Sequence, residues 1–206
     1  GFNLYHAIAD LNKPHLKWLD LWALGQLLIP SQSETLIRVV YCTATKNSDQ
    51  GKMLRHRAYL KSLDSVGVTC VRGHFAEEQR ECRSCGSTWP APVEKQGDVN
   101  LAIALIDDAH RNLFDHANLV SADGDQAATA RLFNERFPDK RLTSVSPPKR
   151  SHSKYILSHA HAKIAISESH LERSIFRGQA VFNSDGSVAA IRPPEYATPP
   201  GWVPPK

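Results

Sequence analysis

The pattern of apolar and polar positions along the chain predicts strands that alternate with helices. Residues 35–45 (TLIRVVYCTAT) are rich in β-branched side chains, which is typical of a buried strand. Apolar side chains near helical spacing in 52–67 predict a helix that stops at Gly67, and 68–75 predicts the next strand. Further upstream, 18–28 also shows near-helical spacing.

The same alternation continues through the second half of the chain. Residues 100–112 are apolar on most sides at their beginning, which predicts a well-buried helix. A short strand over 117–122, a helix over 125–137 and a strand over 140–145 follow. Strands that alternate with helices at this spacing imply a parallel sheet covered on both faces, so we expect an α/β fold.

Two stretches interrupt the alternation. Residues 76–93 are polar, contain two prolines and carry a Cys-x-x-Cys motif, which indicates an insertion between a strand and the helix after it. Residues 192–206 hold six of the thirteen prolines, so we expect an extended strap or a disordered end there. We therefore predict one domain over 1–191, with the insertion inside it, and a Pro-rich tail.

Composition narrows the class of protein only slightly. The 206 residues are 41% apolar, which is enough for the core of one large domain. No apolar run approaches the roughly 18 residues of a membrane span, and the chain does not open on a secretion leader, so we expect no membrane partner. The four cysteines suit the reduced thiols of a cytoplasmic protein better than a disulfide scaffold. A net charge of +4 with ten histidines permits a polyanionic partner without requiring one.

Three carboxylates stand where predicted strands end or helices begin. Asp123 and Asp125 follow the strand 117–122 and are separated only by Gly124, and Asp98 precedes the helix 100–112. Each could be a helix cap. One cap does not need two charges, however, and like charges in one tight turn repel unless a cation lies among them. Ligands bind at the carboxyl edge of parallel sheets, and such carboxylates suit Mg²⁺.

Three segments in this order resemble the NYN domain family, a group of PIN-like, metal-dependent nucleases. They are GFNLYHA at the start, EKQGDVNLA at 94–102 and SADGDQ at 121–126, and weaker similarity covers nearly the whole chain. The resemblance implies a Rossmann-like PIN domain whose ring of carboxylates holds Mg²⁺ or Mn²⁺. Its catalytic and metal-binding members by position are Asp98, Asp123, Asp125 and Asn3.

The resemblance also implies an activity and one departure from the family. The family motif begins with an aspartate directly before the glycine that is Gly1 here, so we expect that aspartate and its strand to lie upstream of this chain. The implied activity is metal-dependent endonucleolytic hydrolysis of RNA. A nucleic-acid or protein-binding module without turnover is the alternative. Phosphomonoester hydrolysis is a second one, because DGD turns also occur in phosphatases.

The Cys-x-x-Cys motif is similar to a zinc knuckle. Cys82 and Cys85 are followed by a glycine, and two thiolates so spaced bind one Zn²⁺ in such knuckles. His74 is the best third ligand, and the fourth stays open among Cys70, His110 and a water. The alternative is a reduced, solvent-facing pair in a β-hairpin; a redox motif fits less well because the context is turn-like.

Basic side chains gather in the loop after the strand 140–145, at the same predicted sheet edge. They are Lys149, Arg150, His152 and Lys154. Beside a metal centre they would contact RNA phosphates, and Lys95, three residues before Asp98, is a further candidate. The alternative is a solvated run of charge. The sequence leaves the oligomeric state open.

Overall fold

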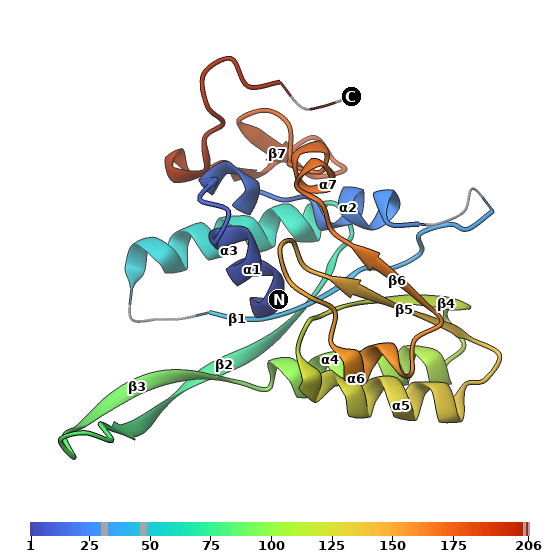
Figure 1. Cartoon of the computed structure of the whole chain (residues 1–206). Coiled ribbons are helices and arrows are strands. Elements are labelled where there is room, and N and C mark those ends of the chain that lie inside the picture. The colour runs from blue at the N-terminus through green and yellow to red at the C-terminus, as the bar shows by residue number, and fades with distance from the viewer. Residues whose placement is uncertain (30–32, 46–48, 204, 206) are drawn as a thin grey trace.

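The strands form two parallel half-sheets at the centre of the molecule (Figure 1). In the first, β1 (Val40–Ala44) pairs in parallel with the beginning of β2 (Thr69–Glu81). In the second, β4 (His116–Val120), β5 (Arg141–Ser146) and β6 (Ala162–Ala165) pair in that order, all in parallel. No backbone pairing joins the two half-sheets in the described part of the chain.

This computed structural model describes residues 1–29, 33–45, 49–203 and 205. Within these ranges, no helix has both the length and the apolar character that a membrane span requires.

Helices cover both faces of the strands. Figure 1 shows one group above the strands, formed by α2 (Leu21–Leu27), α3 (Gln50–Ser65) and α7 (Glu168–Arg173). The other group lies below and contains α4 (Gly97–His110), α5 (Ala127–Arg136) and α6 (Lys154–Leu157). The short α1 (Phe2–Ala9) lies in front, beside β1. The α/β class expected from the sequence is thereby confirmed, although the sheets are partly mixed.

Two apolar clusters hold these layers together, one on each side of the second half-sheet. Alternate residues of a strand point to opposite faces, so Val145 of β5 joins the cluster around the fully buried Trp18, and Leu142 joins the cluster around Phe133. The second cluster lies between β5 and the helices α5 and α6. The strand ends between the clusters are consequently fixed from both sides.

The predicted insertion is an antiparallel hairpin that projects from the body (Figure 1). Gly73 of β2 still pairs with β1, and the next residue, His74, pairs with Lys95 of β3 (Thr88–Lys95). The strand expected over 68–75 therefore continues for several more residues. We call the hairpin from His74 to Lys95 the arm.

Helix α4 is less buried than its sequence suggests. The expectation of a well-buried helix was wrong, because Val99 and Ile103 are 58% and 60% exposed. Only one face of the helix packs, against β1 and α5. The opposite face, which carries Val99 and Ile103, meets solvent.

The Pro-rich tail lies over the first apolar cluster as a strap. It follows a second small hairpin of β7 (Ala180–Phe182) and β8 (Val188–Ile191). The guanidinium of the buried Arg192 donates to the Phe176 carbonyl, and the Trp202 ring lies 5.7 Å from the His15 ring. The tail therefore contributes to the packing of the body.

Candidate functional site

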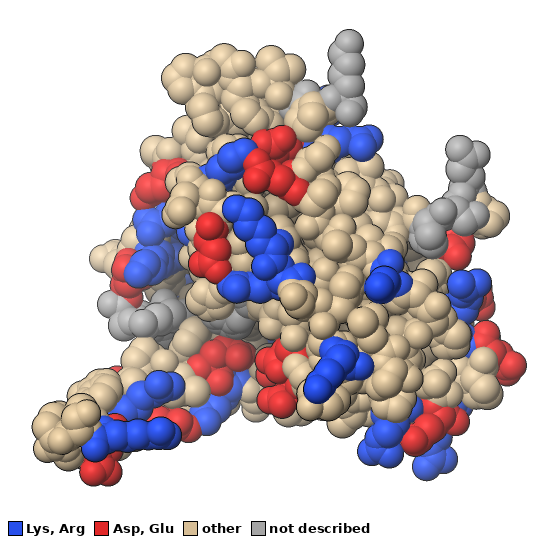
Figure 2. All heavy atoms as spheres, viewed as in Figure 1, with Lys and Arg blue, Asp and Glu red and all other residues tan. Residues whose placement is uncertain are grey.

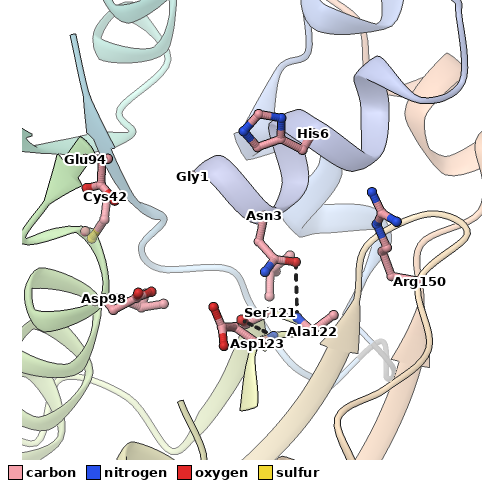
Figure 3. A pocket seen from close by; sticks show the side chains of 13 residues that line it. Gly1, Asn3, His6, Cys42, Glu94, Asp98, Ser121, Ala122, Asp123 and Arg150 are labelled. Atoms are coloured by element: carbon pink, nitrogen blue, oxygen red, sulfur yellow. Dashed lines mark hydrogen bonds between the residues drawn. The ribbon is translucent and has the colours of Figure 1, made fainter. Parts of the chain in front are cut away.

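A pocket of about 470 Å³ lies at the carboxyl end of β4, where the two half-sheets face each other. Separate segments of the chain contribute side chains to its wall, among them Asn3 from α1, Cys42 from β1, Asp98 from α4, Asp123 after β4 and Arg150 after β5. Figure 3 shows the carboxylates of Asp98 and Asp123 pointing toward each other across the opening. The fold therefore brings together residues that are far apart in the sequence.

Asp123 is held in place by the turn that it starts. Its Oδ1 accepts the backbone N–H of Asp125 at 3.1 Å, which caps the 3₁₀ helix η2 (Gly124–Gln126). Its own N–H donates to the hydroxyl of Ser121 at 3.0 Å. These two bonds fix the direction of the side chain after β4. A carboxylate has about four lone-pair sites, so most of its acceptor capacity stays directed at the pocket.

Asp98 is held by the beginning of α5. The N-cap of α4 is Gln96, in a left-handed conformation with φ 73°, so Asp98 is not the capping residue and lies in the first turn. The buried Gln126 donates its amide N–H to Asp98 Oδ1 at 3.2 Å and to the Asp98 carbonyl at 3.3 Å. The carboxylate is thereby fixed while it remains exposed to the opening.

Asn3 lies in the same pocket and connects α1 to the end of β4. Its Oδ1 accepts the backbone N–H of Ala122 at 3.3 Å (Figure 3). The amide oxygen is used by this bond, which leaves the NH₂ group of Asn3 directed at the cavity side.

Asp125 does not join the other two carboxylates. It is exposed on η2 and does not line the pocket. A 3₁₀ helix has about three residues per turn, so the residue two positions after Asp123 points away from it. The expected set of three converging aspartates is therefore not assembled. Among the described residues, no three His, Cys, Asp or Glu side chains have the spacing of a metal site.

The structure adds Glu94, which sequence reasoning missed. This residue near the end of β3 lines the pocket, and its Oε1 is buried without a hydrogen-bond partner. The oxygen lies over the start of α4, since a Cβ at Gly97 would be 2.5 Å from it. The signal in the sequence was its position in the EKQGD segment, four residues before Asp98, at the end of a strand.

The wall between these carboxylates contains a group whose protonation is displaced. Burial raises the pKa of the Cys42 thiol, and Asp98 and Glu94 raise it further, so Cys42 is a neutral thiol at physiological pH.

Of the basic residues singled out in the sequence, Arg150 lines the pocket. Its guanidinium forms an ion pair with Asp10 after α1. Lys149 beside it is exposed and has a left-handed backbone, with φ 55°. Arg150 is thus the one of these two neighbours that lines the opening.

The other three basic candidates have contacts elsewhere. His152 bonds to the hydroxyls of Ser144 and Ser146 on β5, at 3.3 Å each, and burial lowers its pKa, with a smaller effect of Lys163. Two more lie outside the pocket, where Lys154 Nζ is 5.0 Å from the Tyr155 ring and Lys95 pairs with Glu78 on the arm. These positions are structural or peripheral to the pocket.

Among the described residues, no cationic side chain pairs with the pocket carboxylates. Lys95 pairs with Glu78, and Arg131 pairs with Glu135 at 3.4 Å, so neither basic residue neutralises Asp98 or Asp123. No ion pair of Glu94, Asp98 or Asp123 occurs in the described ranges. The burial in salt bridges that would favour a non-catalytic module is therefore not seen.

The donor set of the pocket fits a hard divalent cation in part. Mg²⁺ prefers one or two carboxylates and keeps several waters. The pocket offers three carboxylates, and one of them, Glu94, has a buried oxygen without a hydrogen-bond partner. The spacing of a complete protein site is not present, so waters and substrate oxygens would supply the remaining ligands.

The predicted zinc ligands are separated by the arm. Cys82 and Cys85 lie at its tip, and His74 pairs with Lys95 at its base. Eight residues of strand at about 3.3 Å per residue place His74 roughly 26 Å from Cys82. The expectation that His74 completes a site with the two cysteines is corrected, because an extended strand cannot return to its own start. Cys70 and His110, on β2 within the body and at the end of α4, are no closer.

Comparisons with known proteins leave the family open. No protein-family model matches the chain. It is similar to the 6-hydroxy-3-succinoylpyridine 3-monooxygenase HspA of Pseudomonas putida (strain DSM 28022 / S16), at 25% identity over an alignment of 202 residues that covers 79% of this chain. The match spans 63% of that relative, which is less than two thirds of its length.

A solved structure gives a further similarity. It is a protein of unknown function, VPA0982, from Vibrio parahaemolyticus RIMD 2210633, with a TM-score of 0.49 and 20% identity. The match covers 73% of this chain and 80% of that one.

Proposed function

We propose that this chain is a PIN-like, metal-dependent nuclease that hydrolyses phosphodiester bonds of RNA. The observation that carries the proposal is the pair of carboxylates, Asp98 and Asp123, which face each other across an open pocket with no cationic side chain of the described residues between them. Like charges in this arrangement raise the energy of the empty pocket, and a bound divalent cation removes that cost. The parallel half-sheets and the ordered resemblance to NYN domains support the same assignment.

In this proposal, Asp98 and Asp123 hold Mg²⁺ or Mn²⁺, Glu94 lines the same pocket, and waters and substrate oxygens supply the remaining ligands. Such an ion supplies neutralisation of the phosphodiester charge and acidifies a water that attacks phosphorus. The cap of η2 and the amide of Gln126 keep two of these carboxylates oriented before substrate arrives. The NH₂ group of Asn3 is placed to donate to a phosphate oxygen, because its amide oxygen is already bonded to Ala122.

The rim of the pocket supplies the contacts to the RNA backbone. Arg150 carries positive charge on the side of the opening opposite Asp98, and the exposed Lys149 precedes it in the chain. Arg binds phosphate oxygens through paired N–H groups and fixes the register of the strand without reading its sequence. The substrate class is therefore single-stranded RNA that enters past this rim.

The arm is, in the same proposal, a small zinc-type insertion. Its metal would be held at the tip by Cys82 and Cys85, which do not line the pocket. The two metal sites are chemically independent and can be tested separately.

The test of hydrolysis compares three matched variants: Asp98→Asn, Asp123→Asn and Asp125→Asn. Asparagine keeps the size of aspartate and an acceptor oxygen, so the cap of η2 survives in Asp123→Asn. Cleavage of end-labelled single-stranded RNA in Mg²⁺ or Mn²⁺ should fall by roughly 100-fold or more in the first two variants, a typical effect of removing one transition-state contact. Asp125→Asn, outside the pocket, should stay near the unmodified activity.

The assay is run on this 206-residue chain and on the full natural reading frame. Circular dichroism and urea unfolding report whether each variant is folded. Full cleavage by folded Asp98→Asn and Asp123→Asn proteins would remove the metal-nuclease proposal. RNA binding without cleavage in every form would favour the binding module instead.

The name of the Pseudomonas putida relative provides a second candidate, monooxygenation of a small aromatic compound. Monooxygenases need two electrons for each O₂, which reduced nicotinamide or flavin cofactors commonly supply. An oxygen electrode with 6-hydroxy-3-succinoylpyridine and each reduced cofactor tests this directly. Substrate-dependent uptake of O₂ that persists in Asp98→Asn would make this candidate the better one.

A further inference from the structure

The tip of the arm is a preformed turn with two thiols side by side. The N–H of Cys82 donates to the Ser87 carbonyl at 2.8 Å, and the N–H of Gly86 donates to the Cys82 carbonyl at 2.9 Å. Gly86 has φ 69°, a left-handed conformation that a glycine adopts without strain. The Cys85 sulfur lies 3.1 Å from the Ser87 hydroxyl oxygen. This turn suits two thiolate ligands of one metal ion.

The chain cannot complete a four-ligand site at this tip by itself. Structural zinc is almost always tetrahedral, with four protein ligands. His74 lies at the other end of the arm, and Cys42 and Cys70 belong to β1 and the body end of β2. In the described residues, no third His, Cys, Asp or Glu joins the pair at metal spacing. A complete tetrahedral protein site at this tip therefore needs two ligands from outside the described part of this chain.

The position of the tip allows another molecule to reach it. Figures 1 and 2 show the arm standing clear of the body, with its end surrounded by solvent and with both signs of charge along it. All described residues from Arg83 to Pro90 are exposed, including Trp89 at 45%. A two-stranded ribbon is at best marginally stable alone, so a contact at its end would stabilise it.

A second copy of this chain has the required chemistry. Related by a twofold axis, it presents the same turn and adds its own Cys82 and Cys85, which gives four thiolates and a closed, symmetric contact. Four thiolates around one Zn²⁺ carry a net charge of −2. Arg83, between the two cysteines, and Arg80, across from Trp89, place positive charge beside it in each copy. The exposed Trp89 rings provide apolar area next to the metal.

We propose that one Zn²⁺ joins the arms of two copies of this chain through Cys82 and Cys85 of each. Each thiol releases its proton when it binds, so one ion displaces up to four protons, and binding weakens as the pH falls. Zn²⁺ is not reduced or oxidised, so no electron is exchanged. The inference does not depend on RNA hydrolysis, because the tip residues do not line the pocket.

The experiment measures mass and zinc content together. Protein purified with a phosphine reductant, and supplied with Zn²⁺, is separated by size-exclusion chromatography with light scattering, and the zinc in each peak is determined. We expect a dimer with one zinc per two chains, which a chelator converts to monomer. Small-angle scattering should show an elongated dimer, because two projecting arms meet end to end.

Three variants make the result specific. Cys82→Ser with Cys85→Ser should bind no zinc and stay monomeric. Cys70→Ser, which removes a thiol of the body, should behave as the unmodified chain. Gly186→Ala, in the turn of the other hairpin, controls for a general effect of altering a turn.

Each other outcome overturns the inference. One zinc per chain in a monomer would show that the site is completed within one chain. A dimer that survives both the chelator and the double serine variant would place the association on another surface. Protein without zinc, at neutral pH and with its thiols reduced, would leave a bare hairpin. Loss or survival of RNA cleavage does not alter any of these readings.

Discussion

Single hydrogen bonds decide how the pocket carboxylates are presented. Asp123 is fixed by the turn that it caps, whereas Asp98 depends on the side chain of one residue of another element, Gln126. Gln126 is almost fully buried, and its Oε1 has no partner. Within the described residues, the side chain of Gln126 forms hydrogen bonds only through its NH₂ group, and both bonds go to Asp98. We infer that positioning Asp98 is the role of this side chain.

The first prediction follows from this contact. Gln126→Met keeps the volume and removes the donor, so Asp98 loses its orientation while an unpartnered buried oxygen also disappears. The free energy of unfolding should change by no more than about 1 kcal/mol. RNA cleavage should fall by roughly 10- to 100-fold, as is typical when a residue that positions a metal ligand is lost. Gln126→Glu, which places a buried carboxylate beside Asp98, should be much less stable in urea unfolding. Unchanged cleavage in Gln126→Met would remove the positioning role.

Residues such as these show where sequence reasoning stops. Asp98, Asp123 and Asn3 were identified because each belongs to a motif with a recognisable order. Glu94 and Gln126 were not, because their roles depend on which strand end meets which helix. Asp125 was grouped with Asp123 by proximity, and the three-residue period of η2 separates them.

At the scale of elements, periodicity predicted those that have one buried face. The helices α3 and α5 and the strands β4 and β5 were found within a few residues of their bounds. The arm was predicted as a polar insertion, with a β-hairpin only as the alternative for its Cys-x-x-Cys segment, because both of its faces meet solvent and its polar residues show no alternation. Helix α4 was expected to be more buried than it is. It has more apolar residues than the face that β1 and α5 cover can bury, so some of them remain exposed.

The second prediction concerns the residue at which β2 leaves its sheet. A Cβ at Gly73 would fall well inside contact distance of the Lys95 carbonyl oxygen, a backbone atom that cannot rotate away. Gly73→Ala should therefore open the base of the arm and destabilise the fold by about 1–3 kcal/mol. Gly51→Ala is the matched control, because its Cβ would meet the flexible end of Arg55 in helix α3.

The control variant should be unchanged or more stable by up to about 1 kcal/mol, the helix propensity difference between the two residues. Urea unfolding of both variants provides the comparison. Equal stability of the two would show that the close approach of β2 and β3 at Gly73 contributes nothing.

At the scale of the whole molecule, buried histidines make stability depend on pH. Burial lowers the pKa of His15, His56 and His152. A nearby cation lowers each pKa slightly further: Lys13 acts on His15, Arg72 on His56 and Lys163 on His152. In the unfolded chain such groups titrate near 6.5. Below that pH the unfolded state takes up protons before the folded state does, so the free energy of unfolding must fall.

The third prediction concerns the pH range over which the free energy of unfolding falls. Stability should be constant between about pH 7.5 and pH 8 and should decrease from about pH 6.5 downward, until the folded-state pKa values are passed. His56→Gln with His152→Gln should reduce the decrease between pH 7 and 5.5, and His110→Gln, an exposed control, should not. Urea unfolding at four pH values measures it. A protein that becomes more stable over this range would contradict the argument.

The arm is joined to the pocket by a short stretch of chain. Strand β3 carries Glu94 near its end, and after Gln96 the chain enters α4, where Asp98 is in the first turn. Glu94 is thus part of the arm, and Asp98 follows the last residue of the arm by only three positions. In the proposed dimer, a shift of one arm would move Glu94 and the first turn of α4 together, so the distance between Asp98 and Asp123 is the quantity that binding at the tip would change.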